Sequence, residues 1–262
     1  MTVALPGGLP PLFAWSVVVA LAAVLGSFLN VCISRLPRGE SIVSPPSHCP
    51  RCQTPIRYYD NIPLVSFALL GGRCRACREP IPWRYPVVEA LAIGIGLLAL
   101  WHFGPTWAGL RVFVLGLALV AVTFIDLETR LIPDLITLPG IVVGLLFHLA
   151  WGPWRVVDGL LGCVVAGGLF YLIAWLSELS FGREGMGGGD IKLAAMMGAF
   201  LGLGGVLVAI FLGVMAGGIM ALGLLGFGLK RFGQYLAFGP FLAVGGLIAA
   251  FWAGPILDWY LG

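Results

Sequence analysis

Long apolar runs separated by short polar breaks fill most of this chain. They lie at residues 12–33, 86–103, 107–125, 134–151, 156–180 and about 236–257. Each approaches the roughly 20 residues that an α-helix needs to cross a bilayer. The pattern therefore predicts an all-α fold built from transmembrane helices.

One further apolar stretch, residues 191–229, is too long for a single crossing. It contains 39 residues and only one charged residue, Lys192, near its start. As one helix it would be about 58 Å long, nearly twice the thickness of the hydrocarbon core. A turn near Gly202-Leu203-Gly204-Gly205 would divide it into two helices. With this division the pattern predicts about eight transmembrane helices.

The composition supports a polytopic membrane protein. Of the 262 residues, 60% are hydrophobic and 10% are charged, whereas a soluble domain has about 25% charged residues. The first twelve residues include no basic residue, and no cleavage-site pattern follows the first apolar run. We therefore expect residues 12–33 to be a retained helix and not a signal peptide.

The only long polar segment, residues 34–85, carries the orientation signal. It holds eight of the fifteen basic residues, and basic residues are enriched in cytoplasmic loops. If this segment is cytoplasmic, thirteen of the fifteen fall on that side, and only Arg111 and Arg155 do not. Both termini are then expected outside. An odd number of crossings in residues 191–229 would export Lys230 and Arg231, so the bias also favours the division into two helices.

Four of the six cysteines form two Cys-x-x-Cys pairs in the polar segment, and these are Cys49, Cys52, Cys74 and Cys77. Two such turns can supply four thiolates to one tetrahedral Zn²⁺. The ion would be structural, because the segment has little apolar core of its own. The alternative is a redox protein, which predicts reactive thiols in place of bound Zn²⁺.

Two acidic residues beside apolar runs are the candidates for catalysis. Asp190 follows Gly187, Gly188 and Gly189, and Asp126 ends the run at residues 107–125. Because two predicted crossings separate Asp126 from Asp190, both residues are expected at the same membrane face. Two carboxylates in one site share a proton, so one can take a proton from water while the other polarises a peptide carbonyl. The glycines would leave room for a peptide backbone.

Other acids offer simpler interpretations. Asp134 follows Pro133 and opens an apolar run, which suits a structural acid. Glu128 lies in a short polar loop, where we expect it to be solvated. Glu89, near the start of a run, is either functional or paired with Arg84.

The candidate pair itself has alternative interpretations. Asp190 could simply cap a helix, and Asp126 and Asp190 could form the proton relay of a membrane transporter. A transporter predicts acids deep within the spans and often an internal repeat, and neither is evident. Lys192 and Arg130 could bind a substrate carboxylate or serve as interfacial charges. Trp83, near the end of a run, is expected to be an interfacial anchor.

Several segments together resemble the prepilin peptidases, the GxGD-type membrane aspartic proteases that process type IV prepilins and type II secretion pseudopilins. The matching segments are Gly26 to Val31, Arg35 to Pro37, Cys49 to Cys52, Tyr59 to Leu64, Gly72 to Cys77, Tyr85 to Glu89, Ile125 to Asp134, Gly185 to Lys192 and Phe238 to Phe241. The resemblance implies that Asp126 and Asp190 are catalytic and that the four cysteines bind zinc. It also implies cleavage of a leader peptide after a Gly, at the cytoplasmic face of the bacterial inner membrane.

The resemblance further implies N-methylation of the new N-terminal residue with S-adenosylmethionine, as in many members. No local sequence explains binding of that cofactor, so a cleavage-only peptidase stays open. The expected organisation is a first helix at 1–33, a zinc-binding segment at 34–85 and a peptidase domain at 86–262. Gly187, Gly188, Gly189 and Lys192 are the candidate substrate-binding residues. The expected partners are prepilins and the lipid bilayer, without nucleic acid.

Overall fold

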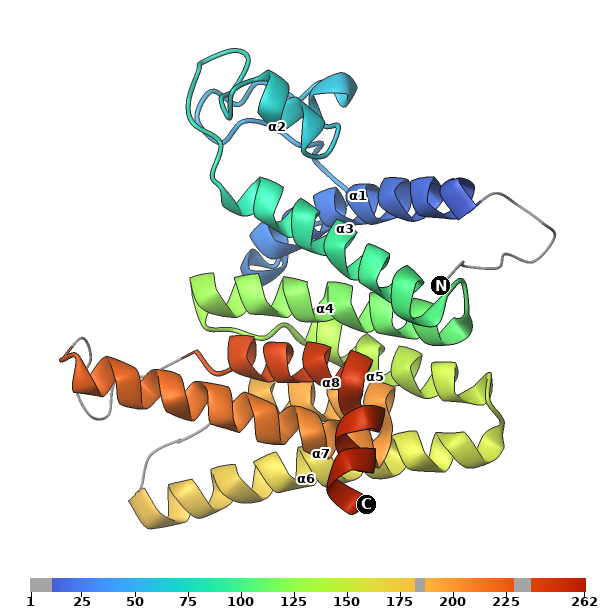
Figure 1. Cartoon of the computed structure of the whole chain (residues 1–262). Coiled ribbons are helices and arrows are strands. Elements are labelled where there is room, and N and C mark those ends of the chain that lie inside the picture. The colour runs from blue at the N-terminus through green and yellow to red at the C-terminus, as the bar shows by residue number, and fades with distance from the viewer. Residues whose placement is uncertain (1–10, 182–186, 229–236) are drawn as a thin grey trace. The chain divides into compact units, whose positions relative to one another are not determined.

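The computed structural model describes residues 11–181, 187–228 and 237–262, which form mainly long helices with an irregular segment between α1 and α3 (Figure 1). Its long helices are α1 (Pro11–Arg35), α3 (Arg84–Phe103), α4 (Trp107–Thr129), α5 (Asp134–Leu149), α6 (Pro153–Phe181), α7 (Gly188–Gly226) and α8 (Gly239–Leu261). Short elements lie between α1 and α3, namely η2 (Leu36–Arg38), η3 (Tyr58–Asp60) and α2 (Val65–Leu69). The described ranges contain two isolated β-bridges and no strand. The prediction of an all-α membrane protein is confirmed.

The number of helices differs slightly from the predicted eight. Among the described residues, six helices are long and apolar enough to cross a bilayer: α1, α3, α4, α6, α7 and α8. The apolar helix α5 has 16 residues, which corresponds to about 24 Å and is short for a full crossing. Helix α7 has 39 residues, but Gly202 interrupts it with φ 73° and ψ −179°. Counted as two halves, α7 brings the apolar helical segments to the predicted number.

The interruption of α7 falls where the sequence predicted a turn, and Asp158 of α6 stabilises it. The Leu203 N–H donates a hydrogen bond of 3.1 Å to Asp158 Oδ1. This bond satisfies a donor that the broken helix leaves without its i−4 carbonyl. A Cβ atom on Gly202 would lie 2.2 Å from Asp158 Oδ2. Both the positive φ and the close carboxylate therefore require glycine at this position.

The chain forms two compact units, residues 1–121 and 122–262. In the first unit, α1 packs along α3. Gly26 of α1 makes this contact close, because a Cβ atom there would lie 2.9 Å from the Glu89 Cα. These units are defined by contacts within the fold. The functional division predicted from the sequence, into residues 1–33, 34–85 and 86–262, stays a prediction.

The second unit contains the last turns of α4 and helices α5 to α8, with α7 packed on α5, α6 and α8. Small residues allow these backbones to touch. A Cβ atom on Gly198 of α7 would lie 2.2 Å from the Gly162 carbonyl oxygen of α6, and one on Gly245 of α8 would lie 2.3 Å from the Ala209 oxygen of α7. Such contacts are typical of membrane helices, whose association depends on close packing and not on the hydrophobic effect.

Two predictions concern residues outside the described ranges: the cytoplasmic position of three basic residues, and part of the family resemblance around Asp190. The basic residues are Arg183, Lys230 and Arg231, and the residues of the resemblance are Gly185 and Met186.

The break in α7 yields a stability test. We expect Gly202→Ala to lower the free energy of unfolding by at least about 1–3 kcal/mol, because alanine is strained at this φ and its Cβ collides with Asp158. Gly218→Ala is the matched control, since nothing lies within 4 Å of a Cβ atom there. Thermal unfolding of the purified protein in detergent measures both variants. Equal melting temperatures for the two would contradict the proposed role of Gly202.

Candidate active site and metal centre

The Asp126 carboxylate lies against the N-terminus of α8. Asp126 belongs to the last turn of α4 and is 3% exposed. Its Oδ2 atom accepts a 3.0 Å hydrogen bond from the N–H of Gly239, the first residue of α8. A helix N-terminus offers free N–H groups and a positive dipole end, so it stabilises a carboxylate. The structure thus gives Asp126 a charge-stabilising partner far away in the sequence.

Gly239 has no room for a side chain. A Cβ atom there would lie 2.7 Å from Asp126 Oδ2. The sequence analysis used Phe238 to Phe241 only as part of the family resemblance and missed this contact. The available signal was a Gly-Pro pair at the start of an apolar run, where proline suits the first helical positions and glycine permits close approach.

Asp190 lies in the first turn of α7 and is 5% exposed. Its N–H donates a 3.1 Å hydrogen bond to the Gly187 carbonyl oxygen. Asp126 lies close enough for its charge to act on Asp190. The structure therefore places the two carboxylates that the sequence selected, at the end of α4 and the start of α7, within range of electrostatic interaction.

The three glycines before Asp190 have different surroundings. Gly187 is the N-cap of α7, with extended backbone angles. A Cβ atom on Gly188 would meet nothing within 4 Å, whereas one on Gly189 would lie 2.8 Å from the Ile132 Cβ. Gly189 thus permits close packing of α7 on the α4–α5 loop, and the open space is next to Gly188.

Lys192 forms an ion pair with Asp134, the first residue of α5. The Lys192 Nζ lies 2.6 Å from Asp134 Oδ1 and 2.7 Å from Oδ2. Both side chains are substantially exposed, so the pair contributes at most about 1 kcal/mol. Such a pair can open at low cost if a substrate carboxylate competes for Lys192. Glu128 is exposed, as expected for a solvated acid.

Glu89 is buried in the first unit and connects its parts. Glu89 Oε2 accepts a 2.8 Å hydrogen bond from the N–H of Leu64, and the Ser27 hydroxyl lies beside it. Leu64 is the N-cap of α2 and has a φ of 58°. The buried carboxylate therefore fixes the start of α2 against α3.

The four paired cysteines converge on one point in the first unit. Their Sγ atoms all lie within 4.8 Å of one another, and those of Cys49 and Cys77 are 3.8 Å apart. Zn–S bonds of about 2.3 Å in a tetrahedron place sulfur atoms about 3.8 Å apart. All four cysteines are free of disulfides. The cluster thus fits a Zn²⁺ ion, which would link two distant parts of the polar segment.

The two cysteine pairs have the same local structure. Gln53 N–H bonds to the Cys49 carbonyl, and Arg78 N–H bonds to the Cys74 carbonyl, at 2.9 and 3.0 Å. Gln53 and Arg78 each have a positive φ. An isolated bridge closes each turn, His48 with Pro55 and Arg73 with Pro80. Each pair therefore forms a tight turn, which we call a knuckle: the first at residues 49–52 and the second at residues 74–77. Each knuckle directs its two thiols towards the common cluster.

The pKa shifts of the clustered thiols differ in direction. A hydrogen bond with the Glu79 backbone lowers the pKa of Cys77, but burial and hydrogen bonds with the other three thiols outweigh it and raise this pKa to about 12. Hydrogen bonds from the side chain and backbone of Thr54 lower the pKa of Cys52 to about 6. The backbone N–H groups of Cys77 and Ala76 lower the pKa of Cys74. Metal ligands must be deprotonated, so the shifts of Cys52 and Cys74 favour metal binding at neutral pH and that of Cys77 opposes it.

A bidentate ion pair attaches η3 to the second knuckle. Arg75 Nε donates to Asp60 Oδ2 at 2.8 Å, and Arg75 Nη2 donates to Oδ1 at 2.6 Å. The hydrogen bond with Arg75 lowers the pKa of Asp60. The planar guanidinium matches the carboxylate in this geometry.

The fold defines a polytopic membrane protein, and two buried aspartates near a helix N-terminus are its candidate active site. Comparison of the sequence with protein families agrees. Residues 20–103 match the bacterial peptidase A24 N-terminal domain, and residues 113–222 match the type IV leader peptidase family. The chain belongs to this aspartic peptidase family.

Individual relatives are similar over nearly their full length. A protein of Aeromonas hydrophila is 37% identical over 97% of this chain and 96% of its own. One of Burkholderia pseudomallei is 38% identical over 96% and 88%, and one of Pseudomonas aeruginosa is 36% identical over 93% and 92%. All three are called prepilin leader peptidase/N-methyltransferase. No solved structure matches the chain.

The cysteine cluster predicts about one Zn²⁺ per chain, measured by elemental analysis of protein purified without added metal. We expect Cys49→Ser and Cys74→Ser to lose most of this zinc, because each removes one of four thiolates. Cys163→Ser is the control, since Cys163 lies in α6 and outside the cluster. A metal-free wild type whose cysteine pairs form reversible disulfides would instead support the redox interpretation.

Proposed function

We propose that this protein is a prepilin peptidase and N-methyltransferase, which cleaves the leader peptide of type IV prepilins and pseudopilins and methylates the new N-terminus. The observation that carries the proposal is that Asp126 and Asp190 are both buried and interact electrostatically, in a chain that belongs to the leader peptidase family. The names of its relatives support both activities.

In the proposed mechanism the two carboxylates have different roles. The Gly239 N–H stabilises charge on Asp126, while Asp126 is itself the charged neighbour of Asp190. We therefore assign the ionised carboxylate to Asp126 and the shared proton to Asp190. Asp126 takes a proton from a water molecule while the oxygen of that water attacks the scissile carbonyl carbon. Asp190 donates a hydrogen bond to the carbonyl oxygen. Asp126 then returns the proton to the leaving amine nitrogen.

The substrate backbone is proposed to approach along the start of α7. Gly188 leaves open space next to Asp190, which suits an extended peptide. Gly187 and Gly189 fix the position of this turn, and Lys192 becomes available to a substrate carboxylate when its exposed pair with Asp134 opens.

The proposed location is the bacterial inner membrane, with both termini outside and the active site at the cytoplasmic face. The support is the distribution of basic residues in the sequence and the presence of six apolar helices among the described residues. The zinc-binding segment at residues 34–85 would then lie in the cytoplasm, where thiols stay reduced. S-adenosylmethionine would supply the methyl group.

A proton-relay transporter is the less favoured function. Asp126 and Asp190 lie in a last and a first helical turn, and a relay through the membrane needs acids at greater depth. A cleavage-only peptidase differs from the proposed enzyme in one respect, the absence of methylation.

The carboxylate pair is tested with Asp126→Asn and Asp190→Asn, which keep the size of each side chain. We expect either variant to reduce leader cleavage by about 10²–10⁴-fold, because each removes a proton-transfer group. Mass spectrometry of a synthetic prepilin incubated with protein in lipid measures the cleavage. Glu128→Gln, which changes an exposed acid near Asp126, serves as the control. Full cleavage by a folded Asp126→Asn variant would exclude the mechanism.

Gly239→Ala tests the hydrogen bond from α8. Its Cβ would lie 2.7 Å from Asp126 Oδ2, so Asp126 must move and lose its aligned donor. We expect a fall in kcat for cleavage of about 10- to 100-fold, since losing one charge-stabilising hydrogen bond costs about 1.5–3 kcal/mol. Gly254→Ala is the control in the same helix, where a Cβ atom meets nothing within 4 Å. Equal kcat values for the Gly239→Ala and Gly254→Ala variants would refute the role of Gly239 in holding Asp126.

A further inference from the structure

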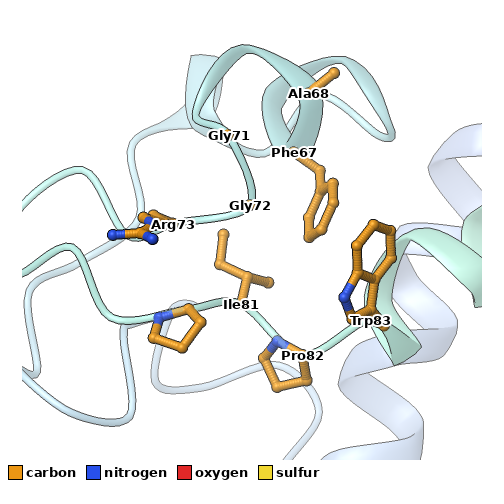
Figure 2. Close-up of a pocket in the computed structure, with 9 residues that line it drawn as sticks. Phe67, Ala68, Gly71, Gly72, Arg73, Ile81, Pro82 and Trp83 are labelled. Atoms are coloured by element: carbon orange, nitrogen blue, oxygen red, sulfur yellow. The ribbon is translucent and has the colours of Figure 1, made fainter.

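A cavity of the first unit lies between α2 and the residues that lead into α3 (Figure 2). Its volume is about 540 Å³, within the range of small-molecule sites. Its lining includes the apolar side chains of Phe67, Ala68, Ile81 and Trp83, and Arg73 is the only charged residue among those that line it. The cavity therefore offers an extended apolar wall and a single cation.

The apolar wall and the cation lie on different sides of the cavity. The ring centroids of Phe67 and Trp83 are 5.2 Å apart, with their planes inclined at 56°. Figure 2 shows both rings beside the cavity, with Arg73 on the opposite side. A guanidinium binds phosphate through paired hydrogen bonds. A ligand with an apolar chain next to a phosphate would match both sides.

The cavity lies near the level at which α3 enters the hydrocarbon core of the bilayer. Helix α3 has 20 residues, or about 30 Å, which just spans the core. Trp83 directly precedes its first residue, Arg84. The Leu64 N–H, at the start of α2, donates to Glu89 Oε2 at 2.8 Å. Glu89 lies about 7.5 Å along α3 from Arg84, and its side chain leans back toward the helix start. The start of α2 is therefore held at the boundary between hydrocarbon and headgroups.

Large apolar side chains at this boundary are exposed. Trp83 is 73% exposed, and Leu69 of α2 is 81% exposed. Exposed apolar surface of this kind marks contact with a membrane or a ligand, and tryptophan is enriched where headgroups meet hydrocarbon. The exposure of these two side chains at this level therefore indicates contact with lipid.

The second cysteine knuckle fixes the walls of the cavity. The Gly72 N–H bonds to the Phe67 carbonyl at 2.8 Å, and the Ile81 N–H bonds to the Gly72 carbonyl at 2.7 Å. Gly72 has a φ of 67°, and a Cβ atom there would lie 3.0 Å from Phe67 Cζ. The second knuckle, residues 74–77, lies between Gly72 and Ile81 in the chain. A metal held by the knuckle would therefore also hold the cavity in shape.

We propose that this cavity binds a membrane phospholipid, with an acyl chain against the Phe67 and Trp83 rings and the phosphate at Arg73. The acyl chain removes the apolar wall from water, which is the main favourable contribution to binding. The bound lipid holds the polar segment against the bilayer surface. The inference goes beyond the proposed enzymatic function and does not depend on it, because it requires only that α1 and α3 cross the membrane.

The first test maps the site by photocrosslinking. The whole, zinc-loaded chain is reconstituted in phosphatidylcholine vesicles that contain phosphatidylcholine with a diazirine on one acyl chain, and labelled residues are located by mass spectrometry. We expect label on Phe67, Ile81 and Trp83, besides exposed residues of α1 and α3. Label on Leu69, which does not line the cavity, without label on any lining residue would show surface contact alone and overturn the proposal. Label confined to the long helices would overturn it too.

A second test fills the cavity. In Ala68→Trp the indole occupies volume that an acyl chain would take, so we expect label on Ile81 and Trp83 to fall about 3- to 10-fold, while label on the exposed Leu69 persists. Ala90→Trp is the matched control, because Ala90 is an exposed residue of α3 outside the lining. Wild-type labelling of Ile81 and Trp83 in the Ala68→Trp variant would contradict binding inside the cavity.

The contact with phosphate is tested with Arg73→Gln. We expect labelling of the cavity by the phosphatidylcholine probe to fall about 3- to 5-fold, the range for an exposed charge pair. Diacylglycerol with the same diazirine chain has no phosphate and should label the variant and the wild type equally. Arg51→Gln, which changes an exposed arginine outside the lining, is the control. Equal labelling of wild type and Arg73→Gln by the phosphatidylcholine probe would refute the role of Arg73.

Two internal measurements report the integrity of each variant, namely its zinc content and the label on α3. Both should stay at wild-type values. The map of the wild type uses no substitution, so it decides the proposal even where a variant loses its zinc.

Discussion

The hydrogen bond between Gly239 and Asp126 is the contact on which the candidate active site depends. A carboxylate that is 3% exposed costs several kcal/mol unless hydrogen-bond donors replace the water it has lost. The free N–H groups at the start of α8 meet this requirement, and the Gly239 N–H reaches Asp126 Oδ2 at 3.0 Å. The contact ties the end of α4 to the start of α8. Asp190 at the start of α7 then completes the site through its electrostatic interaction with Asp126.

Glycine gives the helices of the second unit their spacing. At Gly162, Gly198 and Gly245 a side chain would collide with a neighbouring backbone, so these helices pack backbone against backbone. Close contact of this kind holds helices together where the hydrophobic effect does not act between them. It also positions the candidate site, because Asp190 lies nine residues after the end of α6 and in the first turn of a helix packed along it.

The first unit uses different interactions, because its polar segment has little apolar core. Four thiols within 4.8 Å of one another, the Asp60–Arg75 pair and the Glu89–Leu64 hydrogen bond hold the segment to itself and to α3. The wall of the Phe67–Trp83 cavity is continuous with the second cysteine knuckle. Structural metal binding and the shape of the cavity are thus linked through a few residues of backbone.

The sequence alone determined the helical membrane class, the turn at Gly202, the candidate aspartates and the convergence of the cysteines, because each depends on local composition or spacing. Apolar runs long enough to span a bilayer leave few alternatives to helices, and paired Cys-x-x-Cys turns suit one tetrahedral ion. Only the tertiary structure revealed the roles of Gly239 and Asp158, the ion pair of Lys192 with Asp134, and the pairing of Phe67 with Trp83. In each case the partners come from different elements, and hydrophobic periodicity does not encode which helix ends and loops meet. Contacts between distant segments depend on packing, which the order of residues specifies only through the folded chain as a whole.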